Sequence, residues 1–83
     1  MKLIKIRYKN KEENNYKDVI NCNTICDVEL NTNAGSYSII IHAERLTKFI
    51  KFRTKKETEK IFDDVISFLK LEGDCYLFEV TSL

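Results

Sequence analysis

The sequence of 83 residues has no proline, no tryptophan, two glycines and one histidine. Two glycines leave little backbone freedom to build an anion cradle for phosphate, and one imidazole leaves few arrangements for nucleophilic catalysis. No stretch approaches the roughly 20 apolar residues of a membrane-spanning helix. These absences predict a protein that is not an enzyme, binds no cofactor and does not associate with a membrane. The length predicts a single domain over residues 1–83.

The charge is nearly balanced, with 14 Lys or Arg against 13 Asp or Glu and a formal net charge of +1. Such a balance gives no global attraction to nucleic acid. The chain starts Met-Lys-Leu-Ile-Lys-Ile-Arg, where charges interrupt the apolar residues, so no signal peptide is expected. Three cysteines without a secretion signal are typical of free thiols in a reducing compartment. A cytoplasmic protein is therefore expected.

The residues that are abundant indicate the source of the gene. The sequence has 11 Lys, 7 Asn and 10 Ile, and these amino acids have AT-rich codons. This bias favours a low-GC bacterium, its plasmid or its phage, and hence the cytoplasm of a bacterial host cell.

Alternation of apolar and polar residues predicts five strands, bounded by polar segments at 9–15 and 31–36. The expected ranges are 2–8, 26–31 with a short extension at 19–20, 37–44, 46–53 and 74–80. The third is apolar on both faces at Ile39, Ile40 and Ile41, which is typical of a strand inside a sheet. The fourth also fits a helical spacing, but its Thr, Phe and Ile residues favour a strand.

A helix is expected to begin after Thr54, because Thr54 and Glu57 have the spacing of a capping box. In that motif the Glu57 carboxylate would also accept the Thr54 amide. Apolar residues then recur at intervals of three and four, and Gly73 is expected to end the helix in a left-handed conformation. The sequence thus predicts an α+β fold in the order β-β-β-β-α-β, with one antiparallel sheet of four to five strands packed against one amphipathic helix.

A metal site is one chemical alternative. Cys22 and Cys26 are separated by three residues, and His42 with Cys75 would complete a four-ligand zinc set. The opposing interpretation is buried or half-exposed thiols, since free cysteine is among the most buried residue types. Another alternative is catalysis by His42 with Glu44 on the same strand face, for which no further motif is present.

A basic segment is the main binding hypothesis. Phe49 lies within it, and Glu12, Glu13 and Tyr16 are expected to form a secondary contact with the partner from a loop. The cations of the segment on which the hypothesis depends are Lys48, Lys51, Arg53, Lys55 and Lys56. If Phe49, Lys51 and Arg53 share an outward face, the ring could stack on a base while the cations hold phosphates. The alternative is a solvated strand edge and helix start.

The segment from Ser38-Ile-Ile-Ile through Phe52-Arg-Thr-Lys-Lys-Glu-Thr-Glu-Lys-Ile-Phe-Asp-Asp-Val-Ile66 and on to residue 80 resembles small α+β proteins of Firmicutes phages and mobile elements. In those proteins a strand ends in Ser or Thr, and a helix of the type Lys-x-Glu-x-Glu-x-Ile follows. The resemblance brings no catalytic motif. It implies an accessory factor or an inhibitor of host defence, of which anti-CRISPR proteins are one kind.

These observations lead to two functional hypotheses. The first is a non-enzymatic inhibitor or accessory factor that docks to a larger host protein or protein–nucleic acid complex, because small size and local charge patches suit protein recognition. Self-association is also compatible with so small a core. The second is a single-stranded nucleic-acid binding module that uses Phe49 and the basic segment Lys48–Lys60.

Overall fold

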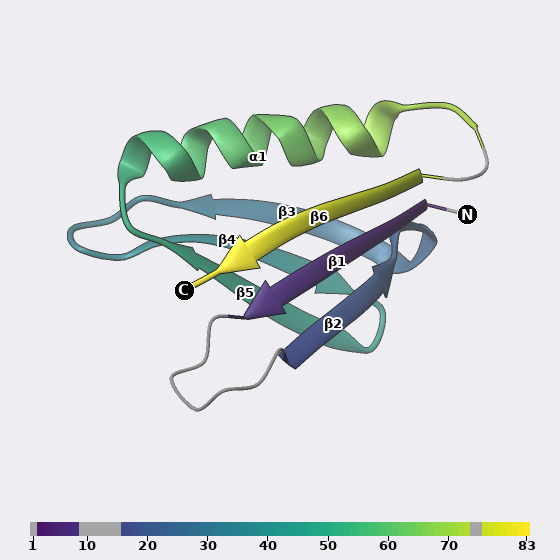
Figure 1. Ribbon diagram of the computed structural model, residues 1–83, viewed down its shortest axis with the longest axis horizontal. Coiled ribbons are helices and arrows are strands. Elements are labelled where there is room, and N and C mark those ends of the chain that lie inside the picture. The colour runs from purple at the N-terminus through teal and green to yellow at the C-terminus, as the bar shows by residue number, and fades with distance from the viewer. Residues whose placement is uncertain (1, 9–15, 74–75) are drawn as a thin grey trace.

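The computed structural model describes residues 2–8, 16–73 and 76–83 (Figure 1). Within these ranges it has six strands, one α-helix and one short 3-10 helix. Their order is β1 (Lys2–Tyr8), β2 (Tyr16–Asn21), η1 (Cys22–Thr24), β3 (Ile25–Asn31), β4 (Tyr37–Ala43), β5 (Leu46–Phe52), α1 (Lys55–Lys70) and β6 (Tyr76–Ser82).

The strands form two sheets of three. The first has the order β2-β1-β6, with β1 antiparallel to β2 and parallel to β6. The second is an antiparallel meander in the order β3-β4-β5. The α+β class is confirmed, but the expected single antiparallel sheet is wrong. Residues 16–21 form a full strand instead of a short extension, and the last strand adds parallel to the first.

Several local predictions are confirmed. The first strand has the expected bounds, and β4 lies between two neighbours in its sheet. The turn before β4 places Gly35 at φ 77°, in the left-handed region that glycine tolerates best. Ser36 N closes this turn by donating to Asn33 O at 2.8 Å. The segment Leu46–Phe52 is a strand and not a helix.

Two junctions, among other contacts, hold the two sheets together. The 3-10 helix η1 carries the chain from β2 in the first sheet to β3 in the second. At the other junction, Lys51 N donates to Ser82 Oγ at 2.9 Å, and Leu83 N donates to Lys51 O at 3.0 Å. The end of β6 is therefore fastened to the end of β5, so the sheets enclose a common interior.

One core fills this interior. Ile4 and Ile6 from the first sheet and Ile39, Ile41 and Ile50 from the second are all fully buried. The helix closes the core, because its Val65 and Phe68 join the same cluster. The Phe68 ring also meets the Phe78 ring of β6 edge-on, with centroids 5.4 Å apart. The helix thus packs against both sheets and does not lie across one face of a single sheet (Figure 1).

The helix begins as expected but ends differently. Thr54 Oγ1 accepts the Glu57 amide at 3.1 Å. The Glu57 carboxylate accepts the Arg53 amide at 3.5 Å, and not the Thr54 amide as expected. The helix ends at Lys70, with Leu71 in an extended conformation as its C-cap. Gly73 comes two residues later at φ 130°, so the expected left-handed glycine cap is wrong.

Candidate functional site

The outer surface of the second sheet is the candidate site. Directly opposed residues of an antiparallel pair share a face, so the register defines rows across β3, β4 and β5. The rows on the outer side are Asp27–His42–Thr47, Glu29–Ile40–Phe49 and Asn31–Ser38–Lys51. We call these nine residues the open face, because the helix and the first sheet pack on the opposite side, where Ile39, Ile41 and Ile50 are buried. Ser38 is the one member of the open face that is itself buried.

Phe49 stands at the centre of the β5 column of this face. Phe49 is 53% exposed, and among the described side chains no other aromatic residue is exposed. Half-buried Ile40 lies beside it on β4, and Lys51 follows it on β5. Phe49 and Lys51 thus share the outward side of β5, whereas Arg53, the third residue of the hypothesis, lies after the end of the strand.

Lys48 does not belong to this surface. Its Cα is opposite that of Ile41, whose side chain is buried in the core, so Lys48 lies on the inner side of β5. Its Nζ forms an ion pair with Asp18 Oδ2 of β2 at 2.8 Å, with side-chain exposures of 27% and 19%. The ion pair connects the two sheets. The structure therefore separates Lys48 from the other predicted contact residues.

The remaining cations surround the end of β5 and the start of α1. Arg53, Lys55 and Lys56 are all exposed. Lys51 and Arg53 line a hollow of about 240 Å³ together with Glu57 and Leu83. The basic end of the open face therefore continues from Lys51 around the helix start.

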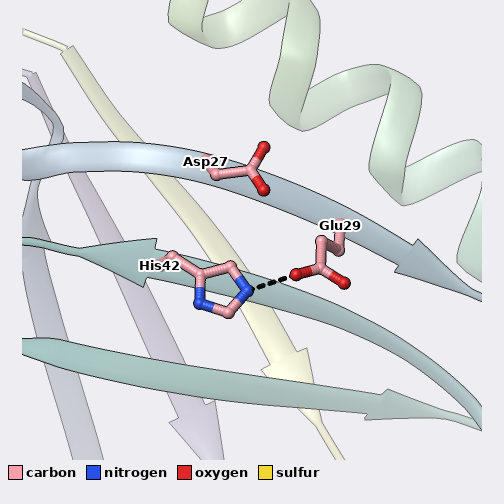
Figure 2. Close-up of side chains that lie close together, drawn as sticks. All are labelled: Asp27, Glu29 and His42. Carbon is pink, nitrogen blue, oxygen red and sulfur yellow. Dashed lines mark hydrogen bonds and ion pairs between the residues drawn. The ribbon is translucent and has the colours of Figure 1, made fainter.

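Acidic groups occupy the opposite edge of the open face. Asp27 and Glu29 project from β3, and the Glu29 Oε1 atom lies 2.5 Å from His42 Nε2 (Figure 2). The Thr47 hydroxyl lies 3.4 Å from the other ring nitrogen, Nδ1. One ligand atom from each of Asp27, Glu29 and His42 falls within 4.8 Å of the others. Among the described residues, the imidazole thus contacts Glu29 of the neighbouring strand and lies near Asp27, and it does not contact Glu44, the partner considered from the sequence.

The thiols take no part in this cluster. Cys22 is half-buried and packs against the core, while Cys26 is exposed. Burial raises the pKa of the Cys22 thiol above its ordinary value, and the nearby Lys2 charge opposes that effect. Within the part of the chain that the structure describes, the only group of three potential metal ligands contains neither cysteine. Cys75 lies outside the described residues.

The sequence predicts a secondary loop contact at Glu12, Glu13 and Tyr16. Glu12 and Glu13 lie outside the described residues. Tyr16 begins β2, where its backbone pairs with that of Tyr8.

The outer side of the first sheet offers an internal comparison. Val19 and Leu77 are 55% and 56% exposed, which is close to the exposure of Phe49. Lys5 lies opposite both Val19 and Glu79, and its Nζ pairs with Glu79 Oε1 at 3.3 Å. This surface lacks an exposed aromatic residue among the described side chains, so it provides matched control positions.

Comparisons of the chain with protein-family models, with curated proteins and with solved structures give no match. In the described part of the chain, no helix has both the length and the apolar character needed to cross a membrane.

Proposed function

We propose that this protein is a small non-enzymatic binding module that docks through its open face to a larger protein. The observation that carries the proposal is the exposed Phe49 with Ile40 beside it, flanked by carboxylates on one side and cations on the other. An aromatic anchor surrounded by polar groups is the usual composition of a protein interface. An inhibitory or accessory role of the phage or mobile-element kind remains part of this proposal.

The charge distribution favours a protein over other partners. Asp27 and Glu29 lie on β3, whereas Lys51 lies on β5 and Arg53 comes just after it, so the carboxylates and the cations lie at opposite edges of the second sheet. A nucleic acid presents one sign of charge and would be repelled by the acidic edge. A protein surface can present acidic groups to the cations, basic groups to the carboxylates and a recess to Phe49.

Affinity capture with matched variants tests the proposal. The tagged protein and its Phe49→Ala variant are used to capture proteins from the cytoplasm of a low-GC bacterium, with quantification by mass spectrometry. We expect Phe49→Ala to reduce capture of the partner about tenfold or more, because truncation of a central aromatic residue removes much of the binding energy. The combined Lys51→Glu and Arg53→Glu variant should also reduce capture.

The controls lie on the outer side of the first sheet. Leu77→Ala removes a side chain of similar exposure, and Arg7→Glu reverses an exposed charge. Both should leave capture unchanged. Equal loss in the controls, or no protein whose capture depends on Phe49, would contradict the proposal.

A second candidate is single-stranded nucleic-acid binding. It is favoured by one observation, namely that Phe49 and Lys51 share an exposed face. This function predicts affinity for a labelled oligonucleotide that falls steeply as salt rises, because neutralised phosphates release counterions. Asp27→Asn and Glu29→Gln would strengthen such binding. Unchanged mobility of the oligonucleotide at low salt excludes it.

A further inference from the structure

We propose that Asp27, Glu29 and His42 form a binding site for a divalent transition-metal ion of the Zn²⁺ class. The site is formed at the acidic edge of the open face by side chains of two neighbouring strands (Figure 2). This inference does not depend on docking, because its test uses the purified protein and the metal alone.

The backbone register brings the three groups together. Asp27 lies directly opposite His42, and Glu29 lies two residues further along β3 on the same face. One potential ligand atom from each residue lies within 4.8 Å of the others. A tetrahedral ion with ligand bonds of about 2.0–2.2 Å needs donor atoms about 3.3 Å apart. Rotation of the exposed Glu29 and Asp27 side chains can bring the donor atoms from their present separation to the separation that the ion needs, without movement of the strands.

The imidazole is already oriented for coordination. Glu29 holds the His42 Nε2 edge, and the Thr47 hydroxyl lies beside Nδ1. A contact at one ring nitrogen fixes the tautomer and ring orientation with which the other nitrogen binds a metal. In the present contact Nε2–H donates to Glu29 Oε1, so an ion that binds at Nε2 must displace this proton. The ring then carries its proton on Nδ1, where the Thr47 hydroxyl can accept it.

The donor set selects the class of ion. Imidazole nitrogen with two carboxylate oxygens suits Zn²⁺ and its neighbours in the first transition row, whereas Ca²⁺ and Mg²⁺ prefer oxygen ligands alone. Three protein ligands leave the remaining coordination position to water, since the cluster lies at the surface. Carboxylates of Asp27 and Glu29 would also neutralise the charge of the ion.

Nuclear magnetic resonance of the His42 ring tests the site directly. The chain has one histidine, so the ring nitrogens of the ¹⁵N-labelled protein give one unambiguous set of signals. After treatment with a chelator, Zn²⁺ is titrated into the protein. We expect the Nε2 signal to move to the position of a metal-bound nitrogen, with Nδ1 carrying the proton. The Zn²⁺ affinity should fall about tenfold or more in Asp27→Asn and in Glu29→Gln.

Glu44→Gln provides the control, because Glu44 is an exposed carboxylate near His42 in sequence but outside the cluster. Its Zn²⁺ affinity should match that of the unsubstituted protein. Backbone amide spectra establish that each variant is folded. Unchanged ring signals in excess Zn²⁺ would overturn the proposal, including the case in which the ion binds to cysteine. Equal affinities for Asp27→Asn, Glu29→Gln and Glu44→Gln would also overturn it.

Discussion

Lys48 directs its charge toward the interior of the molecule, where Asp18 of the other sheet meets it at 2.8 Å. Both side chains are mostly shielded from water, so each charge depends on the other for compensation of its lost hydration. An unpaired charge at this position would be costly. The ion pair therefore fixes how β2 of the first sheet lies against β5 of the second.

Removal of either partner should destabilise the fold. We expect Asp18→Asn and Lys48→Ala each to lower the free energy of unfolding by about 1–3 kcal/mol, because one charge is left without its partner. Urea unfolding of both variants and of the double variant measures the coupling between the two residues. Lys60→Ala is the control, since Lys60 and Asp64 form an exposed i,i+4 pair worth about 0.5 kcal/mol or less. A Lys48 effect as small as that of Lys60 would contradict this role.

The Cys22 thiol should show a pH dependence set by the fold. Partial burial raises its pKa, with the Lys2 charge acting in the opposite direction. The folded protein therefore holds less reactive thiolate at Cys22 at a given alkaline pH than the unfolded chain does. We expect the alkylation rate of Cys22 to rise at higher pH in the folded protein than in urea, as followed by peptide mass mapping.

The same pKa shift has a consequence for stability. Because the folded pKa is higher, the contribution of Cys22 to stability is complete below the pKa of the unfolded thiol and is lost as pH rises through the folded value. Identical pH profiles for Cys22 in the folded and unfolded protein would contradict this account.

At the scale of the elements, the sequence correctly predicted those strands and the helix start that depend on neighbouring residues in the chain. Alternation identified β1 and β4, and the Thr54–Glu57 spacing identified the start of α1. The strand β2 was missed because Asp18 occupies an inward position opposite buried Ile6 and breaks the apolar alternation. Its partner Lys48 is 30 residues away in sequence, so no local window contains both charges.

The sequence did not predict that Asp27, Glu29 and His42 lie close together, because their proximity depends on the register of two strands. Ile39, Ile40 and Ile41 are apolar on both faces, so the hydrophobic pattern fits several registers of β3 against β4. The pairing of Asp27 with His42 depends on the observed register and on an irregularity between Ile25 and Asp27. Alternation along the strand places Asp27 and Glu29 on one face, but sequence alone did not show that His42 of the neighbouring strand shares this face.

The helix start provides a prediction at this scale. Thr54→Ala removes the hydroxyl that accepts the Glu57 amide, and we expect the free energy of unfolding to fall by about 1 kcal/mol. Thr54→Ser retains the hydroxyl and should stay close to the unsubstituted protein in the same denaturation experiment. Equal stability of Thr54→Ala and Thr54→Ser would show that the cap does not stabilise the helix.

For the molecule as a whole, the decisive contacts are long-range. The parallel pairing of β1 with β6 joins the two ends of the described chain, and the link from Ser82 to Lys51 fastens the sheets together. Parallel pairing needs a crossover whose partner no local pattern specifies. The fold class could therefore be predicted, whereas the division into two sheets could not.

This division determines which surface is available for binding. The described helix closes the shared core, so both sheets keep an outer side free of described secondary structure (Figure 1). Of these two surfaces, the open face has an exposed aromatic residue between opposite charges, and the other has Val19 and Leu77. The central claim is that the open face makes the functional contact.

Site-specific photo-crosslinking in bacterial cells tests this claim most directly. The photoreactive phenylalanine analogue benzoylphenylalanine is placed at position 49 in one variant and at position 77 in another, since these side chains have similar exposure. We predict a discrete cross-linked protein from position 49 and none from position 77. Absence of a cross-link from position 49, or the same product from both positions, would contradict the claim.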